Sequence, residues 1–122
     1  MNTNPTRPTQ TVIKRLFARS GDRCAYPRCT VTLVQSETVV GEICHILASS
    51  PDGPRYDEHQ SPQARHGYDN LILLCPIHHE IVDDDPEAYT KERLRKMKID
   101  HEASTGDIDA QDVEHGSRLL TN

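Results

Sequence analysis

The sequence contains few of the residues that build a large hydrophobic core. Its 122 residues include no tryptophan and one phenylalanine, and only 34% of the chain is hydrophobic. A chain of this length fits one small domain with tails. Small domains with so little apolar material usually depend on disulfides or a metal for stability, so we expect a crosslink of one of these kinds.

Long apolar runs are also absent. No run approaches the roughly 20 residues that a membrane-spanning helix needs, and the N-terminus, MNTNPTRPTQ, has no apolar segment like that of a secretory signal. We therefore predict a cytoplasmic protein with no membrane partner. In that reducing compartment the four cysteines are expected to bind zinc. A binding protein stapled by disulfides is the disfavoured alternative.

The negative charge of the chain is unevenly distributed. The formal net charge is −5, but six of the 19 acidic residues and only one of the 14 basic residues lie in residues 100–122, so the remainder is neutral. The first thirty residues carry six basic side chains against one acidic side chain. This basic end can contact the phosphates of nucleic acid, although a solvated helix face explains any single charge about as well.

The N-terminal part predicts an arm followed by a helix. Residues 1–8 hold two prolines and no apolar pattern, which predicts a disordered arm. Thr9 or Thr11 can cap a short helix that ends at Gly21. The apolar face of this helix consists of Val12, Ile13, Leu16 and Phe17.

Two short strands are predicted in the middle of the chain. The β-branched run from Thr38 to Ile46 predicts one strand with Gly41 as a bulge, and Leu71 to Leu74 predicts a second strand. Between them, residues 47–68 are rich in Pro, Gly, Ser and charge. A loop of that length in a small domain is usually functional or mobile.

Helices are predicted after the second strand. Pro76 suits the first turn of a helix that runs to about Asp84, and Thr90 can cap a last helix that begins KERLRKMKIDHE. Together with the strands these helices predict a domain of the α+β class over residues 9–103. Residues 104–122 are expected to form an acidic linker or tail, compatible with a further C-terminal domain in a longer parent protein.

Four candidate zinc ligands occur as two close pairs. Cys24 and Cys29 flank a turn that contains a proline, as a zinc knuckle requires, and Cys75 and His78 are two residues apart. Structural zinc takes four tetrahedral sulfur or nitrogen ligands paired in this way. His79 is the competing fourth ligand, but His78 keeps the two-residue gap that is typical of a zinc turn.

The assignment of His78 to the zinc leaves His79 free for a second group of polar residues. His79 and Asp83 are four residues apart on a helix and hence on one face, where they can hold a divalent cation. His45 ends the first strand, which should pair with the second strand and bring its imidazole near that cation. A neutral histidine there can take a proton from water. The amide of Asn70, at the start of the second strand, can tie the loops together.

The order and context of these residues resemble the HNH, or ββα-metal, endonucleases of the zinc-containing type. The resemblance covers about Pro8 to Glu102. The segments that carry it are Cys24-x4-Cys29, then EICHI at residues 42–46, GPRYD at residues 53–57, and the run from Asp69 to Asp83. An isolated H…N…H pattern would be weak, whereas this composite is specific.

The resemblance implies a small ββα-metal (HNH) nuclease fold with a structural zinc knuckle, flanked by N- and C-terminal helices. It implies His45 as the general base, Asn70 as the residue that orients the hairpin loop, and His79 as a ligand of the catalytic ion, Mg²⁺ or another divalent cation. Asp83 is a second candidate ligand of that ion. The structural Zn²⁺ would be held by Cys24, Cys29, Cys75 and His78.

One position departs from the pattern of the family. Many members carry an acid or a histidine directly before the first catalytic histidine, whereas this chain has Cys44, a poor partner for Mg²⁺. Glu42, two residues earlier, is another candidate. The sequence leaves open whether either residue joins the metal shell.

The resemblance also implies a biological context and a partner. Such modules are found at the N-terminus of bacterial anti-phage or restriction proteins, where a C-terminal sensor domain follows. The partner is double-stranded DNA, with Arg55, Lys14 and Arg15 as predicted phosphate contacts, and a homodimer would allow both strands to be cut. A non-catalytic zinc-dependent module that binds DNA or protein is the alternative function.

Overall fold

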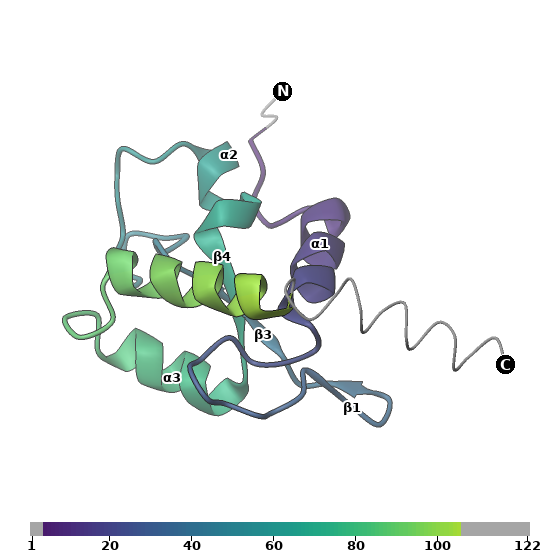
Figure 1. Ribbon diagram of the computed structural model, residues 1–122. Helices are drawn as coiled ribbons and strands as arrows, with labels where there is room; N and C mark the ends of the chain where they lie inside the picture. Colours follow the sequence, from purple (N-terminus) through teal and green to yellow (C-terminus); the bar gives the residue numbers. More distant parts are fainter. Residues whose placement is uncertain (1–3, 106–122) are drawn as a thin grey trace, which may run out of the picture.

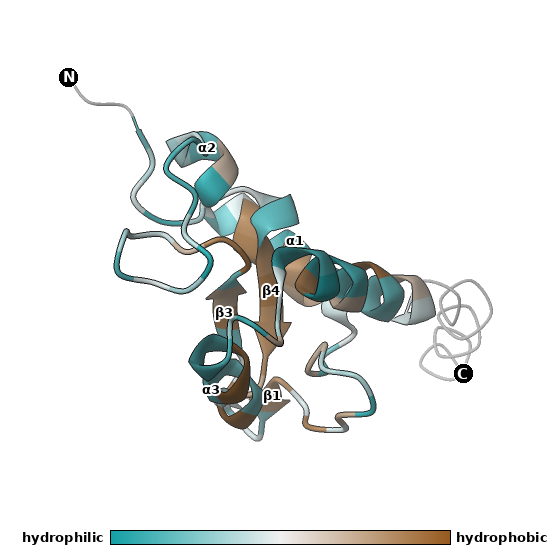
Figure 2. Ribbon diagram, turned by 90° about the vertical axis from the view of Figure 1, so that its left-hand side faces the viewer, coloured by the Kyte–Doolittle hydropathy of each residue, from teal (hydrophilic) through white to brown (hydrophobic). Residues whose placement is uncertain are grey.

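An antiparallel pair of strands, β3 (Glu42–His45) and β4 (Leu71–Leu74), lies at the centre of the computed structural model, which describes residues 4–105 (Figure 1). The register pairs Glu42 with Leu74 and His45 with Leu71. All four residues of β4 are buried, because α1 (Gln10–Ser20) and α3 (Pro76–Asp84) both contact it. Figure 2 shows these helices on different sides of a uniformly hydrophobic β4.

Helix α1 forms as the sequence predicts. The side chain of Thr9 accepts a hydrogen bond from the Val12 N–H, and Gly21 adopts the left-handed conformation at the C-terminal cap. Leu16 is buried on the face that packs against the core. Of the predicted disordered arm, residues 1–3 lie outside the described residues, and residues 4–8 form no helix or strand.

The predicted strand from Thr38 to Ile46 is wrong in its first half. Val34–Gln35 (β1) pairs with Thr38–Val39 (β2) in a separate two-stranded sheet, and β3 begins only at Glu42. The N–H groups of Val40 and Gly41 both donate to the Leu33 carbonyl, which turns the chain from one sheet to the other. A Cβ at Gly41 would lie 2.8 Å from a methyl carbon of Leu33, so the close approach requires glycine.

The long loop contains two short elements that the sequence analysis missed. A four-residue helix, α2 (Pro62–Arg65), begins where the Ser61 side chain accepts from the Ala64 N–H, and a 3₁₀ turn, η1 (Tyr68–Asn70), leads directly into β4. The Ser61-Pro62 pair is a recognisable helix start. These elements fix the end of the loop against the strand pair.

The last two predicted helices are present. Helix α3 begins at Pro76 and ends at Asp84, and Thr90 accepts from the Arg93 N–H at the start of a helix that covers residues 91–105. This last helix passes the predicted domain boundary at residue 103, and residues 106–122 of the predicted tail lie outside the described residues. No helix within residues 4–105 is long and apolar enough to cross a membrane. The fold is mixed α+β, with two small antiparallel sheets.

Candidate metal centres

Two groups of side chains that could each hold a metal ion meet at the start of α3. The thiolate cluster consists of Cys24, Cys29, Cys75 and His78. The mixed cluster consists of Cys44, His79 and Asp83. Within each cluster the ligand atoms all lie within 4.8 Å of one another, so neighbouring histidines on one helix belong to different groups.

The thiolate cluster joins a turn near the N-terminus to the end of β4. The Cys29 N–H donates to the Tyr26 carbonyl, and Arg28 adopts a left-handed conformation that closes the turn. The Ala25 N–H donates to the Leu73 carbonyl at 3.0 Å, which attaches the turn to β4. Cys75 is the residue that follows β4, so the same attachment brings the two cysteine pairs together.

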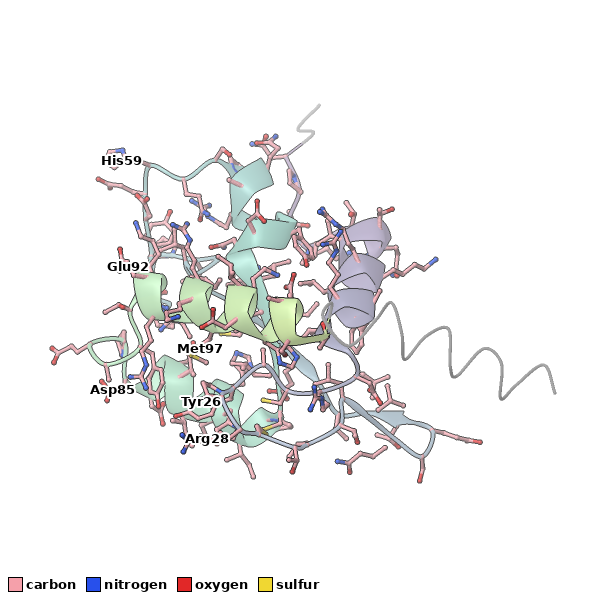
Figure 3. All side chains as sticks on the ribbon, viewed as in Figure 1. Tyr26, Arg28, His59, Asp85, Glu92 and Met97 are labelled. Atoms are coloured by element: carbon pink, nitrogen blue, oxygen red, sulfur yellow. The ribbon has the colours of Figure 1, made fainter. Side chains whose placement is uncertain are left out.

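The imidazole of His78 is held in place by an aromatic contact. Its Nδ1 lies 3.2 Å from the Cys75 sulfur and 3.8 Å from the Cys24 sulfur. The Tyr26 ring stacks on it at 3.9 Å with 2° between the planes, and the Tyr26 hydroxyl lies 2.6 Å from that of Tyr89. Figure 3 shows Tyr26 and Arg28 on the turn beside α3.

Three thiols and one imidazole are the donor set of a structural zinc site. Burial raises the pKa of the Cys24 thiol to about 12, which disfavours a bare thiolate, whereas a bound cation stabilises the deprotonated form. The four cysteines carry no disulfide in the structure. The prediction that Cys24, Cys29, Cys75 and His78 lie together and can hold a metal such as zinc is confirmed.

The mixed cluster is built from β3 and α3. His79 Nε2 lies 3.1 Å from the Asp83 Oδ2 on the next turn of α3. Cys44, on the adjacent strand, is fully buried, and its thiol donates to Asp83 Oδ1 at 3.6 Å. Sulfur, nitrogen and oxygen donors therefore converge from two elements.

Two charged residues hold the ligands of the mixed cluster from outside. Glu42 Oε1 lies 2.9 Å from His79 Nδ1, and an Arg55 nitrogen lies 2.8 Å from Asp83 Oδ1. The hydrogen bond to Asp83, supported by those to Cys44 and Glu42, raises the pKa of His79 to about 11. Burial alone would raise the pKa of Asp83, but hydrogen bonds from His79 and Arg55 lower it overall. Outer partners of this kind orient the ligands of metal sites.

His45 shares a cavity with the mixed cluster. It lines a space of about 170 Å³ together with His79 and Asp83. Its Nε2 lies 3.1 Å from the Nδ1 of His66, whose residue is 9% exposed. Burial first, and His66 second, lower the pKa of His45, so its imidazole is uncharged at neutral pH.

The side chain of Asn70 closes the long loop. Its amide nitrogen donates to the Leu47 and Arg65 carbonyls at 2.9 and 2.8 Å, and its amide oxygen accepts from the Leu47 N–H at 2.9 Å. The side chain thus ties both ends of the long loop to the start of β4.

The three predicted phosphate contacts lie in different surroundings. Lys14 and Arg15 are exposed on α1, with the Arg15 guanidinium 4.1 Å from the centre of the Tyr68 ring. Arg55, by contrast, has a side chain only 5% exposed and donates to the Ile46 carbonyl as well as to Asp83. We therefore interpret Arg55 as a residue that fixes Asp83 rather than one that contacts DNA.

The sequence gives no sign of a role for His66, and it leaves open whether Cys44 or Glu42 joins the metal shell. Of the two candidates, the ligand atom of Cys44 lies in the mixed cluster, and Glu42 contacts His79 from outside. His66 lies in the long loop without any spacing that connects it to His45. The position of His66 depends on α2, and the only sequence feature that indicates this helix is the Ser61-Pro62 pair at its start.

Comparison of the chain with models of known protein families and with curated proteins gives no match. The assignment of a function therefore rests on the geometry of the two clusters and the cavity between β3 and α3.

Proposed function

We propose that this protein is a metal-dependent DNA endonuclease of the HNH, or ββα-metal, family. The observation that carries the proposal is the cavity where His45 at the end of β3 meets His79 and Asp83 of α3. Strand β3 and helix α3 supply these residues, and β4 pairs with β3 and leads into α3, which is the order that the ββα-metal resemblance implies. The cavity combines an uncharged base with a group of metal-binding side chains.

The residues of the mixed cluster fit a divalent cation. His79 Nε2 and Asp83 Oδ2 face each other at 3.1 Å, and Glu42 and Arg55 hold their outer atoms. A bound cation would supply Lewis-acid stabilisation of the charge that develops on the scissile phosphate. The outer partners keep the donors in place before substrate arrives, which is the pre-organisation that such stabilisation requires.

His45 supplies the general base in this proposal. An uncharged imidazole at neutral pH can accept a proton from the attacking water. The Nε2 of His45 lies beside His66. When this Nε2 carries the ring hydrogen, the Nδ1 of His45 is the nitrogen that can accept the proton of the water. Asn70 holds the strand end on which His45 stands, because the Ile46 N–H donates to the Asn70 carbonyl at 2.8 Å.

The proposed substrate is double-stranded DNA. The exposed Lys14 and Arg15 on α1 are the proposed phosphate contacts, and the thiolate cluster is the zinc-dependent staple that keeps the small domain folded. One cavity acts on one phosphodiester, so a homodimer would break both strands. We place this activity in a bacterial anti-phage or restriction system, where a further domain supplies the control signal.

Plasmid cleavage in Mg²⁺ or Mn²⁺ tests the proposal. His45→Ala should lower the cleavage rate by roughly 10²–10⁴-fold, the usual contribution of general base catalysis. His59→Ala is the matched control, since its imidazole is 86% exposed on the outer loop (Figure 3) and should leave the rate unchanged. Equal rates for His45→Ala and the parent protein would disprove the mechanism.

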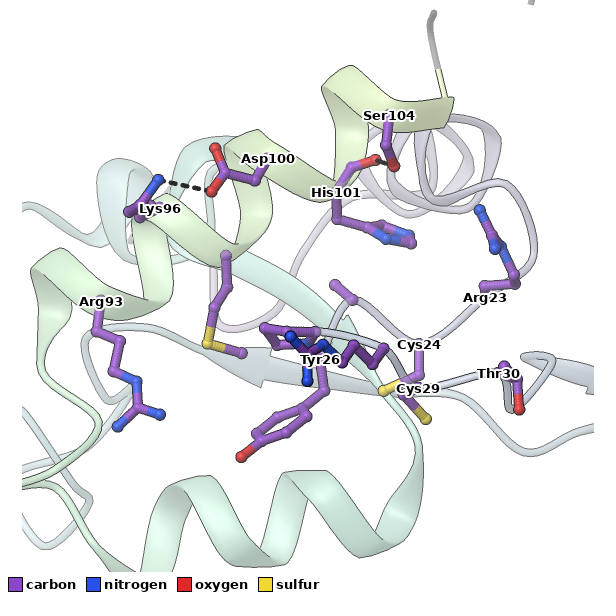
Figure 4. A pocket seen from close by; sticks show the side chains of 14 residues that line it. Arg23, Cys24, Tyr26, Cys29, Thr30, Arg93, Lys96, Asp100, His101 and Ser104 are labelled. Atoms are coloured by element: carbon purple, nitrogen blue, oxygen red, sulfur yellow. Dashed lines mark hydrogen bonds and ion pairs between the residues drawn. The ribbon is translucent and has the colours of Figure 1, made fainter. Parts of the chain in front are cut away.

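A non-catalytic, zinc-dependent DNA-binding module is the second candidate, and one observation favours it. A cavity of about 490 Å³ lies between the Cys24–Cys29 turn and the last helix, with Arg23 and Arg93 on opposite sides and Tyr26 between them (Figure 4). Within residues 4–105 the guanidinium groups of Arg23 and Arg28, which line this cavity, form no salt bridge.

Salt-dependent DNA binding separates the two candidates. If binding is the whole function, Arg28→Ala should weaken binding and reduce the salt slope by about one, the value expected for a lost phosphate contact. His45→Ala would then change neither binding nor any cleavage. Metal-dependent cleavage that His45→Ala abolishes would reject this second candidate.

A further inference from the structure

Cys44 is a buried, metal-binding side chain that the proposed mechanism does not use. It is fully buried on β3, opposite Ile72 and directly before His45. Its thiol points at the ligands on α3, with the sulfur 3.6 Å from Asp83 Oδ1. Burial alone does not indicate metal binding, because a cysteine can be buried without a metal. The position of the Cys44 sulfur relative to the other donors therefore decides its role.

The three donors of the mixed cluster lie at distances that suit one ion. Zinc–sulfur and zinc–nitrogen bonds are about 2.3 and 2.0–2.1 Å long, so two donors on one ion are at most about 4.4 Å apart. The ligand atoms of Cys44, His79 and Asp83 all lie within 4.8 Å of one another. Donors that share a tetrahedral ion are roughly 3.4–3.6 Å apart, and the structure places His79 Nε2 3.1 Å from Asp83 Oδ2 and the Cys44 sulfur 3.6 Å from Asp83 Oδ1.

The surroundings of the cluster select which histidine nitrogen faces the ion. Glu42 lies 2.9 Å from His79 Nδ1, which leaves Nε2 turned toward Asp83. Metal-bound histidines commonly donate their second N–H to a carboxylate in this way, and metal-bound carboxylates are themselves hydrogen-bonded. Arg55 provides that second contact to Asp83. The cluster thus has both an inner donor set and an outer shell.

We propose that Cys44 is a direct ligand of this ion and that the mixed cluster selects a thiolate-accepting cation of the Zn²⁺ or Co²⁺ class over Mg²⁺. Mg²⁺ demands oxygen donors in near-octahedral geometry, whereas thiolate and imidazole favour the later transition metals. On binding, the Cys44 thiol and the His79 imidazolium each release a proton to solvent, and the freed sulfur and Nε2 bond the cation. The inference names the metal of the proposed nuclease site, but it concerns binding and does not require that DNA is cut.

Cobalt absorption tests the ligand directly. The full chain is loaded with one equivalent of Zn²⁺, which is colourless and fills the thiolate cluster, and Co²⁺ is then added. Zn²⁺ stays in place because cobalt binds the same donors more weakly, and metal analysis of the washed protein checks this. We expect one equivalent of Co²⁺ to bind with a near-ultraviolet sulfur-to-cobalt charge-transfer band that a thousandfold excess of Mg²⁺ does not remove.

Variants assign that band to Cys44. Cys44→Ser should abolish the band and weaken Co²⁺ binding by at least about tenfold, since even the loss of an outer partner costs about 10–100-fold. Glu80→Ala, an exposed acid on the same helix, is the matched control and should change neither. Circular dichroism verifies that each variant is folded. If Cys44→Ser does not fold, the presence or absence of the band in the parent protein remains an independent test.

Three results would overturn the inference. They are binding of Co²⁺ by the Zn²⁺-loaded parent without a sulfur band, no binding of a second ion, and displacement of Co²⁺ by stoichiometric Mg²⁺. None of these measurements uses DNA. A protein that shows the band but cuts no plasmid in Mg²⁺, Mn²⁺, Co²⁺ or Zn²⁺ therefore rejects the endonuclease and keeps the metal site. A protein that cuts in Mg²⁺ without the band keeps the endonuclease and rejects the metal site.

Discussion

The thiolate cluster and the mixed cluster begin one residue apart on α3 but differ in composition and surroundings. The thiolate cluster offers three sulfurs and one nitrogen, and it joins segments that lie 54 residues apart at Cys24 and His78. The mixed cluster offers one sulfur, one nitrogen and one oxygen beside a cavity. The first donor set closes around a metal and stabilises a fold, whereas the second leaves coordination positions for other ligands.

The 100° between successive helical residues explains how one helix serves both clusters. His78 faces the Cys24–Cys29 turn and stacks on Tyr26, and His79 faces β3 and contacts Glu42. Because the same turn of α3 carries both side chains, a metal in the thiolate cluster also fixes the direction of His79. The comparison predicts that damage to the first cluster affects the second, and that damage to the second leaves the first intact.

The largest expected difference lies between His78→Ala and His79→Ala. Zinc binding contributes roughly 10–16 kcal/mol to folding in zinc peptides, which matches or exceeds the whole stability of a typical small domain, about 5–15 kcal/mol. His78→Ala should therefore lose zinc and unfold, whereas His79→Ala should keep one zinc and its fold and lose only a weaker second ion. Metal analysis combined with thermal unfolding by circular dichroism measures both outcomes.

The control for this pair is chelation of the parent protein. Gradual removal of metal should release the ion of the mixed cluster first, without loss of helical signal, and the zinc second, together with unfolding. Simultaneous release of both ions, or a folded protein without zinc, would show that the two clusters do not divide the tasks in this way.

Arg55→Ala should have the next largest effect. Arg55 has a 5% exposed side chain and pairs with an Asp83 that is 31% exposed. Breaking a fully buried pair costs about 3–5 kcal/mol, so this pair, in which only Asp83 is partly exposed, should cost about 2–3 kcal/mol in the free energy of unfolding. Loss of the contact should also weaken the ion of the mixed cluster by about 10–100-fold.

Urea unfolding and calorimetric metal titration measure the two effects of Arg55→Ala. Arg95→Ala, an exposed position on the last helix, is the control for loss of an arginine charge. A variant with parental metal affinity would indicate that Arg55 is a purely structural residue and that Asp83 needs no outer partner.

The pH dependence of cleavage is expected to show a smaller effect. His45 must be uncharged to accept a proton, and burial together with His66 lowers its pKa below 6.5. The rate should therefore rise with pH through a midpoint below 6.5 and stay level toward neutrality. For the same reason protonation of His45 disfavours the folded state as the pH falls below 6.5. A pH–rate profile with saturating metal measures the midpoint.

His66→Gln should move that midpoint upward, because it removes the second cause of the lowered pKa while burial remains. The fold is checked by circular dichroism at each pH. An acid limb at or above 6.5 in the parent protein would contradict the assignment of His45 as the uncharged base.

The parts that the sequence predicted depend on short-range patterns. The two pairs of candidate zinc ligands have fixed local spacings, and the Thr9 and Gly21 caps act within one helical turn. The apolar run from Leu71 to Leu74, which lies between a turn and a helix that starts with proline, also predicts a buried strand without ambiguity. Each of these patterns is complete within a few residues, so each element can be predicted without knowing the path of the rest of the chain.

The parts that the sequence did not predict depend on the path of the long loop. The contacts of His45 with His66 and of Arg55 with Asp83 span 21 and 28 residues, and no local pattern relates such positions. The break at Gly41 was missed because a β-branched run has the same composition whether it forms one strand or two. Only the close approach of Leu33 to Gly41 separates β2 from β3.

The smallest expected effect tests how firmly the thiolate cluster is held. Tyr26 stacks on His78 and its hydroxyl lies 2.6 Å from that of Tyr89. Tyr26→Phe keeps the ring and removes one hydrogen bond, which should cost about 0.5–1.5 kcal/mol in the free energy of unfolding. Tyr26→Ala also removes the ring and should weaken zinc binding, measured by competition with a chelator. Because the stack acts on His78 and not on His79, neither change should alter the affinity of the mixed cluster as long as zinc is still bound. A loss of that affinity in the zinc-loaded variants would show that the two clusters are coupled through this ring.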